Sequence, residues 1–392
     1  MNELDAVYAF FVAATLAAAL TPLAKRLAVR VGAVDAPSDR GLSDRPMPRL
    51  GGLAILVAVL VAGALFLPDD GETRSILGAA AVITVVGAVD DIRRLPWWVK
   101  LAGQIGAGLI PVLSGVQVDH VTIPFLSPID FGDAGGPLTL LGLVALMNVV
   151  NFSDGVDGLA AGVCAISAIA FAVIAFDLQR EAAGVLAGLT AGAAIGFLFY
   201  NFHPASVFMG DSGSNLLGLL LGCIAVQGSL KTNALIALAG PLVILAVPFL
   251  DTSFVIAKRI RDRVPIYAPD SEHFHHRFAR MGFTQRRTVL YLYLWTLTLA
   301  GLAVALRFVP YSDHHGHFNT GWSLVIMGLG LIALAASVYL VYVLEIFKYG
   351  RQLRASDPDT SEHEIAERIA RDLETGEFEA VRSRSPQSSS RP

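Results

Sequence analysis

The sequence predicts an all-α, multi-pass membrane protein, and three observations support this fold class. First, 54% of the 392 residues are hydrophobic and only 16% are charged, whereas soluble domains carry about a quarter charged residues. Second, the chain contains many long apolar segments with almost no charge, as expected of helices that cross a bilayer. Third, the lysines and arginines collect in alternate loops between those segments.

The apolar segments predict about eleven membrane-spanning helices. They cover approximately residues 5–24, 50–67, 75–89, 100–114, 135–151, 158–176, 182–200, 212–228, 234–257, 288–309 and 321–347. The first has no preceding basic region and no small-residue cleavage site after it, so we expect it to be retained as a span. Cys164 and Cys223 both lie inside apolar runs, where we expect them to be small core residues.

The distribution of positive charge predicts the orientation. One set of loops and the C-terminal tail hold 25 of the 29 lysines and arginines. These loops are 25–49, 90–100, 151–157, 201–211 and 258–287. By the positive-inside rule this set is cytoplasmic and the N-terminus faces outward. We therefore expect a transmembrane domain over 1–350 and a polar cytoplasmic tail, partly disordered, over 351–392. The alternating loop 115–134 predicts a short external β-hairpin.

Four polar motifs fall at the predicted cytoplasmic edge. Ionisable groups at a membrane cost several kcal/mol unless compensated, so they are functional candidates by default. Asp90 and Asp91 end the third segment, where two carboxylates oppose the helix dipole. The neighbouring Arg93 and Arg94 offer a simpler explanation, in which the four charges balance one another at a solvated helix end.

The stretch "NVVNFSDGVDGLAAG" carries polar residues at every third position. Asn148, Asn151 and Asp154 would share one side of a helix, and Asp157 follows them. The asparagines are equally compatible with hydrogen bonds between helices. That explanation suits the aspartates poorly, because no basic residue occurs between Leu138 and Arg180.

Two further motifs complete the set. Asp211 in "FMGDSGS" begins a helix, either as a simple cap or as a carboxylate beside amide groups that attract an anion. His273, His275 and His276, followed by Arg277, lack the usual zinc spacing and suit a phosphate-rich ligand.

Together these motifs predict phosphoryl transfer at the cytoplasmic face of a membrane. Five aspartates in one place would repel one another, and a divalent cation resolves the repulsion. Mg²⁺ prefers one or two carboxylates completed by substrate phosphates, and Mn²⁺ is the alternative ion. We expect a lipid substrate and no nucleic acid, with a homodimer as one compatible assembly.

The motifs "DD", "NxxNFxDGxDGLAAG", "FMGDSGS" and "DxxHxHHRF" occur here in an order that resembles one family. This is the polyprenyl-phosphate N-acetylhexosamine-1-phosphate transferase superfamily, or glycosyltransferase 4 family, and the resemblance runs from about Asp35 to Phe278. It includes the bacterial lipid-carrier GlcNAc-1-phosphate transferases, to which "HFHHRF" is similar, and the phospho-MurNAc-pentapeptide translocase.

The resemblance implies an activity in the bacterial inner membrane. A UDP-amino sugar, UDP-GlcNAc in the GlcNAc branch, gives its sugar-1-phosphate to undecaprenyl or decaprenyl phosphate, and UMP leaves in an Mg²⁺-dependent step. This would be the first membrane step of a cell-envelope polysaccharide pathway. The alternative donor is UDP-MurNAc-pentapeptide. A transporter is a further alternative, but the carboxylates lie at one edge and no repeat is visible.

The resemblance also implies roles for individual residues. Those implied as catalytic are Asp90, Asp91, Asp154 and His273. Those implied as metal ligands are Asp211 and Asp91. Those implied as substrate-binding are Arg49, Asn148, Asn151, Asp157, His275, His276 and Arg277. The first loop ends in the family's Pro-Arg-x-Gly-Gly pattern but has Gly41 and Ser43 where the family commonly has Lys and His, so Arg40, Arg45 or Arg49 would substitute.

Overall fold

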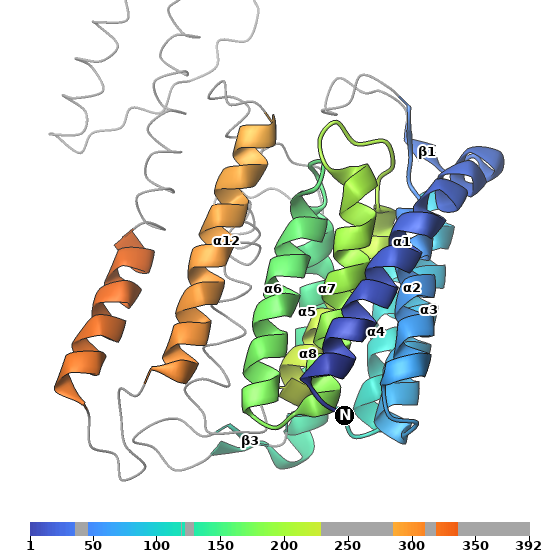
Figure 1. Ribbon diagram of the computed structural model, residues 1–392. Helices are drawn as coiled ribbons and strands as arrows, with labels where there is room; N and C mark the ends of the chain where they lie inside the picture. Colours follow the sequence, from blue (N-terminus) through green and yellow to red (C-terminus); the bar gives the residue numbers. More distant parts are fainter. Residues whose placement is uncertain (36–45, 119, 122–128, 229–284, 310–318, 336–392) are drawn as a thin grey trace, which may run out of the picture.

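The computed structural model describes residues 1–35, 46–118, 120–121, 129–228, 285–309 and 319–335 (Figure 1). Its labelled α-helices are α1 (Glu3–Val31), α2 (Gly51–Phe66), α3 (Gly71–Arg93), α4 (Trp97–Leu113), α5 (Gly135–Ser153), α6 (Leu159–Asp177), α7 (Glu181–Asn201), α8 (Gly210–Gly228) and α12 (Gln285–Phe308). The predicted span 234–257, the histidine motif at 273–277 and the tail 351–392 lie outside the described residues.

The described helices coincide with the spans predicted from the sequence. Six of them are long and apolar enough to cross a membrane, and shorter apolar helices cover Gly51–Phe66, Trp97–Leu113 and Thr320–Ala335. The all-α membrane architecture is therefore confirmed. The total of eleven spans and the outward N-terminus stay predictions.

Helix α8 forms the centre of the bundle. It packs against α2, α3, α5, α6 and α7, and in the described structure every one of its residues except Gln227 is buried. A helix that is apolar on all sides is stable only when other helices surround it. The first turn of α8 is thereby enclosed by the ends of its neighbours.

Close contact between α1 and α7 depends on a row of glycines. Gly188, Gly192 and Gly196 lie one turn apart on α7 and face the backbone of α1. A Cβ at Gly192 would meet the carbonyl oxygen of Phe10. Small residues at this spacing let two helix backbones approach, which is how helices associate in a bilayer, where burial of apolar surface gives little driving force.

Two short antiparallel pairs lie at opposite ends of the bundle (Figure 1). The first joins β1 (Val34–Asp35) to β2 (Met47–Pro48) near the end of α1, and β2 leads directly into Arg49. The second joins β3 (His120–Val121) to β4 (Ile129–Asp130), within the loop 115–134. The placement of this second loop outside the cell stays a prediction.

Helix α12 packs along α6. Val289, Leu292 and Trp295 of α12 form an apolar cluster with Leu159 and Val163 of α6. Because α12 begins at Gln285, just beyond the histidine motif, this packing returns the chain to the end of the bundle where α6 begins.

Candidate active site

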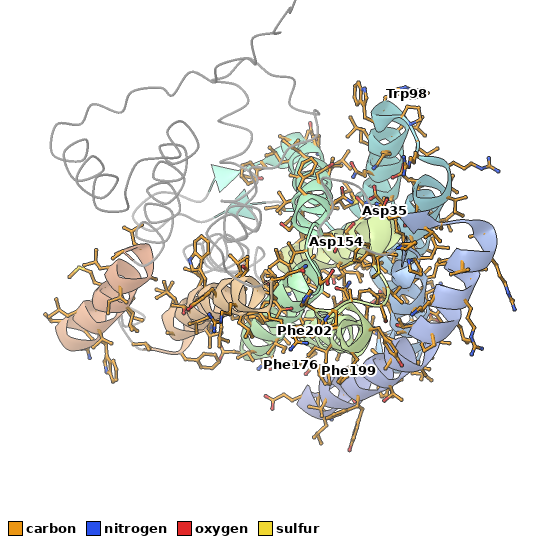
Figure 2. The ribbon with its side chains drawn as sticks, turned by 90° about the horizontal axis from the view of Figure 1, so that it is seen from above. Asp35, Trp98, Asp154, Phe176, Phe199 and Phe202 are labelled. Carbon is orange, nitrogen blue, oxygen red and sulfur yellow. The ribbon has the colours of Figure 1, made fainter. Side chains whose placement is uncertain are left out.

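Carboxylates from three helices meet at one end of the bundle. Asp90 and Asp91 lie in the last turn of α3, Asp154 follows the end of α5, and Asp211 lies in the first turn of α8. Asp35 and Asp154 are labelled in the view onto this end (Figure 2). The structure thus brings together four of the five predicted aspartates.

The Asp91 carboxylate accepts hydrogen bonds from the first turn of α8. Its Oδ1 accepts a hydrogen bond of 2.9 Å from the amide of Asp211, and its Oδ2 accepts one of 3.1 Å from the amide of Ser212. The first amides of a helix have no partner within the helix, and a carboxylate there also interacts favourably with the helix dipole. Asp91 therefore fixes α8 to α3, across 120 residues of chain.

Glycines make this approach possible. Gly210, which precedes Asp211, has φ of +72°, a backbone conformation that favours glycine, and a Cβ there would meet the Asp91 carboxylate and the carbonyl of Arg49. Gly52, at the start of α2, lies directly against Gly213 of α8. The glycines of the "PRLGG" and "MGDSGS" motifs thus fit the two segments together.

Lys100 connects Asp90 with Asp211. Its Nζ lies 2.8 Å from Asp90 Oδ2 and also pairs with Asp211 Oδ2. Asp90 accepts a further hydrogen bond of 2.6 Å from the amide of Leu95. The sequence analysis counted Lys100 only as a loop cation. The only signal that could have pointed to it is a lone lysine near the start of an apolar helix, shortly after Asp90 and Asp91.

Arg49 is the second cation of the cluster. Its guanidinium lies 3.6 Å from Asp35, 3.7 Å from Asp91 and 3.8 Å from Asp211. Burial acts to lower the pKa of Arg49, but the carboxylates of Asp91, Asp35 and Asp211 outweigh it, and the pKa is raised above its usual value. Asp35 was not predicted as a site residue.

The asparagines of the α5 motif bond to neighbouring helices. Asn151 Nδ2 donates to Ser214 Oγ of α8 at 2.8 Å. Asn148 Nδ2 donates to Gln104 Oε1 of α4 at 2.9 Å. Both residues therefore tie neighbouring helices together, and Asn151 does so near the start of α8.

The two aspartates after α5 have different surroundings. Burial raises the pKa of Asp154; the Arg49 guanidinium opposes this, the carboxylates of Asp211 and Asp91 add to it, and the pKa lies well above its usual value. Asp157 Oδ2 is bonded to His203 Nδ1 at 2.8 Å and accepts from the amide of Ala205 at 3.0 Å. Asp157 thus holds the 203–205 loop, which the sequence analysis did not foresee.

The start of α12 is attached to the same region. Arg286 Nε donates to the carbonyl of His203 at 3.0 Å, and the hydroxyl of Tyr293 donates to the carbonyl of Gly158. His273, His275, His276 and Arg277 lie outside the described residues, as do Arg40, Gly41, Ser43 and Arg45.

The donor set suits a hard cation such as Mg²⁺. The carboxylate oxygens of Asp90 and Asp211 already attract an ammonium group, and Mg²⁺ prefers one or two carboxylates when substrate phosphates complete its shell. Within the described part of the chain, no group of three or more His, Cys, Asp or Glu side chains is placed to hold a metal ion.

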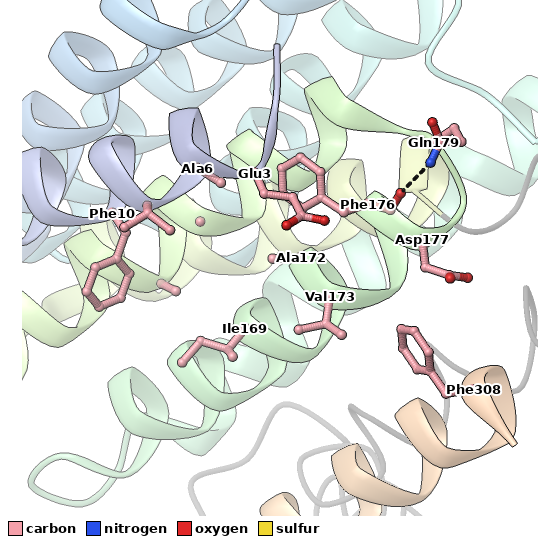
Figure 3. A pocket seen from close by; sticks show the side chains of 13 residues that line it. Glu3, Ala6, Phe10, Ile169, Ala172, Val173, Phe176, Asp177, Gln179 and Phe308 are labelled. Atoms are coloured by element: carbon pink, nitrogen blue, oxygen red, sulfur yellow. Dashed lines mark hydrogen bonds between the residues drawn. The ribbon is translucent and has the colours of Figure 1, made fainter.

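A cavity of about 580 Å³ lies at the opposite end of the bundle (Figure 3). Its lining comes from α1, α6, α7 and α12 and is mostly apolar, with Phe10, Val173 and Phe308 among the labelled side chains. It contains none of the predicted site residues, so the carboxylate cluster is not part of this cavity.

Fold and site together define a class: a multi-pass membrane protein with carboxylates and two basic side chains at one end of its helix bundle. Comparison with known proteins specifies the family. Residues 73–229 match the model of glycosyl transferase family 4. The chain belongs to this family, and the resemblance seen in the sequence motifs is confirmed.

Relatives with curated names cover most of the chain. It is 40% identical over 304 residues to the probable undecaprenyl-phosphate N-acetylglucosaminyl 1-phosphate transferase of Bacillus subtilis, covering 77% of this chain and 85% of that protein. It is 36% identical over 349 residues to the decaprenyl-phosphate N-acetylglucosaminephosphotransferase of Mycolicibacterium smegmatis, covering 81% and 84%. Identity to the phospho-N-acetylmuramoyl-pentapeptide-transferase of Desulforamulus reducens is 32% over 283 residues, covering 67% and 83%.

Proposed function

We propose that this protein transfers GlcNAc-1-phosphate from UDP-GlcNAc to a polyprenyl phosphate in the bacterial inner membrane. The products are polyprenyl-diphospho-GlcNAc and UMP. The observation that carries the proposal is the cluster of Asp90, Lys100, Asp211 and Arg49 at one end of apolar helices, in a chain whose relatives at 36 to 40% identity are named for this kind of transfer.

The chemistry requires one bond to form and one to break. An oxygen of the lipid phosphate attacks the phosphorus that bears the sugar, a new P–O–P linkage forms, and the P–O bond to UMP breaks, with UMP taking the bonding electrons. Asp90 lies at the end of α3, at the edge of the bundle where a lipid phosphate would arrive. When that phosphate is a monoanion, Asp90 accepts its proton.

The basic residues and the amide groups orient the phosphates. Arg49 offers a planar guanidinium already held among three carboxylates, and such forks recognise phosphate well. Lys100 balances part of the charge of Asp90 and Asp211. Because positioning and electrostatics supply most of the catalysis in phosphoryl transfer, these fixed charges are the main contribution of the described residues.

Mg²⁺ is the proposed cofactor, with Asp211 as its principal protein ligand. Bound there, it would neutralise charge on the transferred phosphoryl group. The family resemblance also implies Asp91 as a metal ligand. Since both Asp91 oxygens accept bonds from α8 amides, we assign Asp91 instead to holding Asp211 in place.

A reconstituted assay tests this function. Purified protein in detergent is given polyprenyl phosphate and UDP-GlcNAc labelled in the sugar, and both lipid-soluble label and released UMP are measured. We expect product only when Mg²⁺ and the lipid are both present, and none after chelation by EDTA. Full activity of Asp211→Asn would refute the metal assignment. Transfer from UDP-MurNAc-pentapeptide and not from UDP-GlcNAc would refute the assignment of UDP-GlcNAc as the donor.

We also propose that the carboxylate end faces the cytoplasm, from the distribution of lysine and arginine. The native Cys164 and Cys223 are buried, so single exposed cysteines can be labelled selectively. Arg94, at the carboxylate end, and Asp69, at the other end, have side chains that are 81% and 82% exposed. A membrane-impermeant maleimide added to intact cells should label Asp69→Cys and spare Arg94→Cys. The reverse labelling pattern would show that the carboxylate end faces outward and would refute this orientation.

A further inference from the structure

Gln104 is a buried polar residue that belongs to none of the predicted motifs. It lies on α4 with only 4% of its surface exposed. Its Oε1 accepts from Asn148 Nδ2 of α5 at 2.9 Å, while its Nε2 donates to Asn215 Oδ1 of α8 at 2.8 Å. A buried amide needs such partners, because each unpaired polar group costs about 1–3 kcal/mol.

The hydrogen bonds continue beyond Gln104. Asn215 Nδ2 donates to the main-chain carbonyl of Asp211, one turn earlier on α8, at 2.8 Å. Three side-chain amides therefore follow one another head to tail, from Asn148 through Gln104 and Asn215 to the first turn of α8. We call these three residues the amide relay. One end is a predicted substrate-binding residue, and the other holds the residue proposed to bind the metal.

The hydrogen bonds of Gln104 fix which way the amide groups of Asn148 and Asn215 are turned. Asn148 Nδ2 donates both to Gln104 and to the carbonyl of Val144, so its nitrogen side is fixed toward α4 and its own helix. Its Oδ1 is then the atom that Asn148 can offer to a hydroxyl or N–H group. At the other end, Asn215 Oδ1 accepts from Gln104 while its Nδ2 donates to the Asp211 carbonyl, so the bond from Gln104 favours the amide orientation that supports this carbonyl.

We propose that Gln104 is a positioning residue of the transfer reaction: through the amide relay it orients Asn148 toward the donor substrate and fixes the first turn of α8, which carries Asp211. This inference rests on the proposed function. Gln104 touches no substrate itself. It acts because an amide is the side chain that accepts at one end and donates at the other, which joins α4, α5 and α8 at the site.

Gln104→Met tests the proposal, because methionine keeps the length of the side chain and removes both hydrogen bonds. Gln227→Met is the matched control. Gln227 lies at the far end of the same helix α8 and makes one bond between helices, from Nε2 to Glu72 Oε2 at 2.8 Å. Both variants lose a glutamine that hydrogen-bonds to another helix, but only the first disturbs the site.

We expect kcat of Gln104→Met to fall about 10- to 100-fold, as when supporting residues of a metal site are removed. The Mg²⁺ concentration for half-maximal activity should rise, and Mn²⁺ binding to the substrate-free protein, followed by electron paramagnetic resonance, should weaken. KM for the polyprenyl phosphate should change by less than about threefold, because no residue of the amide relay is proposed to contact the lipid phosphate. Gln227→Met should match the wild type in all four measurements.

Two results would overturn the proposal. One is a Gln104→Met enzyme with kcat and Mn²⁺ binding unchanged. The other is an equal loss of activity in both variants that follows their thermal unfolding midpoints, which would mean that Gln104 only stabilises the bundle.

A double variant tests whether Gln104 and Asn148 act together. When Gln104→Met and Asn148→Ala are combined, the fold-loss of kcat should be smaller than the product of the two single fold-losses. A loss equal to the product would show that the two residues act independently. If the wild type transfers no sugar phosphate, the proposed function fails, and Mn²⁺ binding still tests the relay.

Discussion

Gly87→Ala should uncouple the end of α3 from the start of α8. Gly87 lies one turn before Asp91 on α3, so both face the first turn of α8. A Cβ at Gly87 would lie 2.5 Å from the backbone N and Cα of Ser212, whereas ordinary contact begins at 3.4 Å. These atoms belong to the backbone of Ser212 and cannot rotate away. The two helices must therefore separate by about 0.9 Å.

That separation is enough to break the contacts of Asp91. The hydrogen bonds to the amides of Asp211 and Ser212, now 2.9 and 3.1 Å, would lengthen to about 3.8 and 4.0 Å, beyond the hydrogen-bonding range. A misplacement of about 1 Å in a catalytic group costs about 100-fold in rate. Overpacking costs about 1–3 kcal/mol of stability in addition.

Transfer of labelled GlcNAc-phosphate to polyprenyl phosphate measures the first effect, and thermal unfolding in detergent measures the second. Gly78→Ala is the control, because Gly78 lies on the same helix and a Cβ there meets nothing within 4 Å. We expect kcat to fall about 100-fold in Gly87→Ala and to stay unchanged in Gly78→Ala, whose helix gains up to about 1 kcal/mol. Wild-type activity in Gly87→Ala would show that the geometry of Asp91 and α8 is not needed for transfer.

Three further variants test the charges of the site. Lys100→Met removes the cation shared by Asp90 and Asp211, and kcat for UMP release should fall about 10- to 100-fold. Arg49→Lys keeps the charge but cannot reach three carboxylates as a planar fork, so kcat should fall about 10-fold. Asp154→Asn tests stability against pH, because burial raises the pKa of Asp154 in the folded protein. Below the ordinary pKa of 3.8 the wild-type carboxyl is neutral in both the folded and the unfolded protein. As pH rises toward the raised pKa of the folded state, the unfolded state ionises first, so the free energy of unfolding of the wild type falls. The melting temperature of the variant should therefore exceed that of the wild type more at about pH 8 than at about pH 5.

The results that would contradict these expectations are specific. For the two cations the control is Arg74→Lys, an exposed residue paired with Asp69 at the other end of the bundle. If Lys100→Met or Arg49→Lys is no slower than this control, the ion pairs of the cluster contribute nothing to catalysis. For Asp154, an advantage of the asparagine variant that is the same at both pH values would show that ionisation of the carboxyl does not oppose folding.

Much of the architecture could be predicted without a structure. The span of an apolar segment depends on its own length and composition, so the predicted spans 50–67 and 135–151 agree closely with α2 and α5. Asp90, Asp154 and Asp211 could be predicted as site residues because they stand in polar motifs at the ends of apolar segments. Charged groups are costly within a bilayer and therefore stand out where they occur at its edge.

The partners of these residues could not be predicted, because they depend on contacts between distant parts of the chain. The Asp91 carboxylate and the α8 amides are 120 residues apart. The substrate-binding role expected of Asp157 stays a prediction, while the hydrogen bonds of its Oδ2 to the 203–205 loop were not indicated by any motif. Lys100 and Gln104 belong to no motif and gain significance only through the packing of α4 beside α3, α5 and α8.

The sequence by itself determined which segments enter the membrane, at which ends the polar residues lie and which family the motifs resemble, since each follows from local composition and order. Only the tertiary structure decided how the charges are paired: Lys100 between Asp90 and Asp211, Arg49 among Asp35, Asp91 and Asp211, and the amide relay behind them. Electrostatic and hydrogen-bonding energies depend on distances of a few ångströms, and those distances exist only after glycines have allowed the helices to pack.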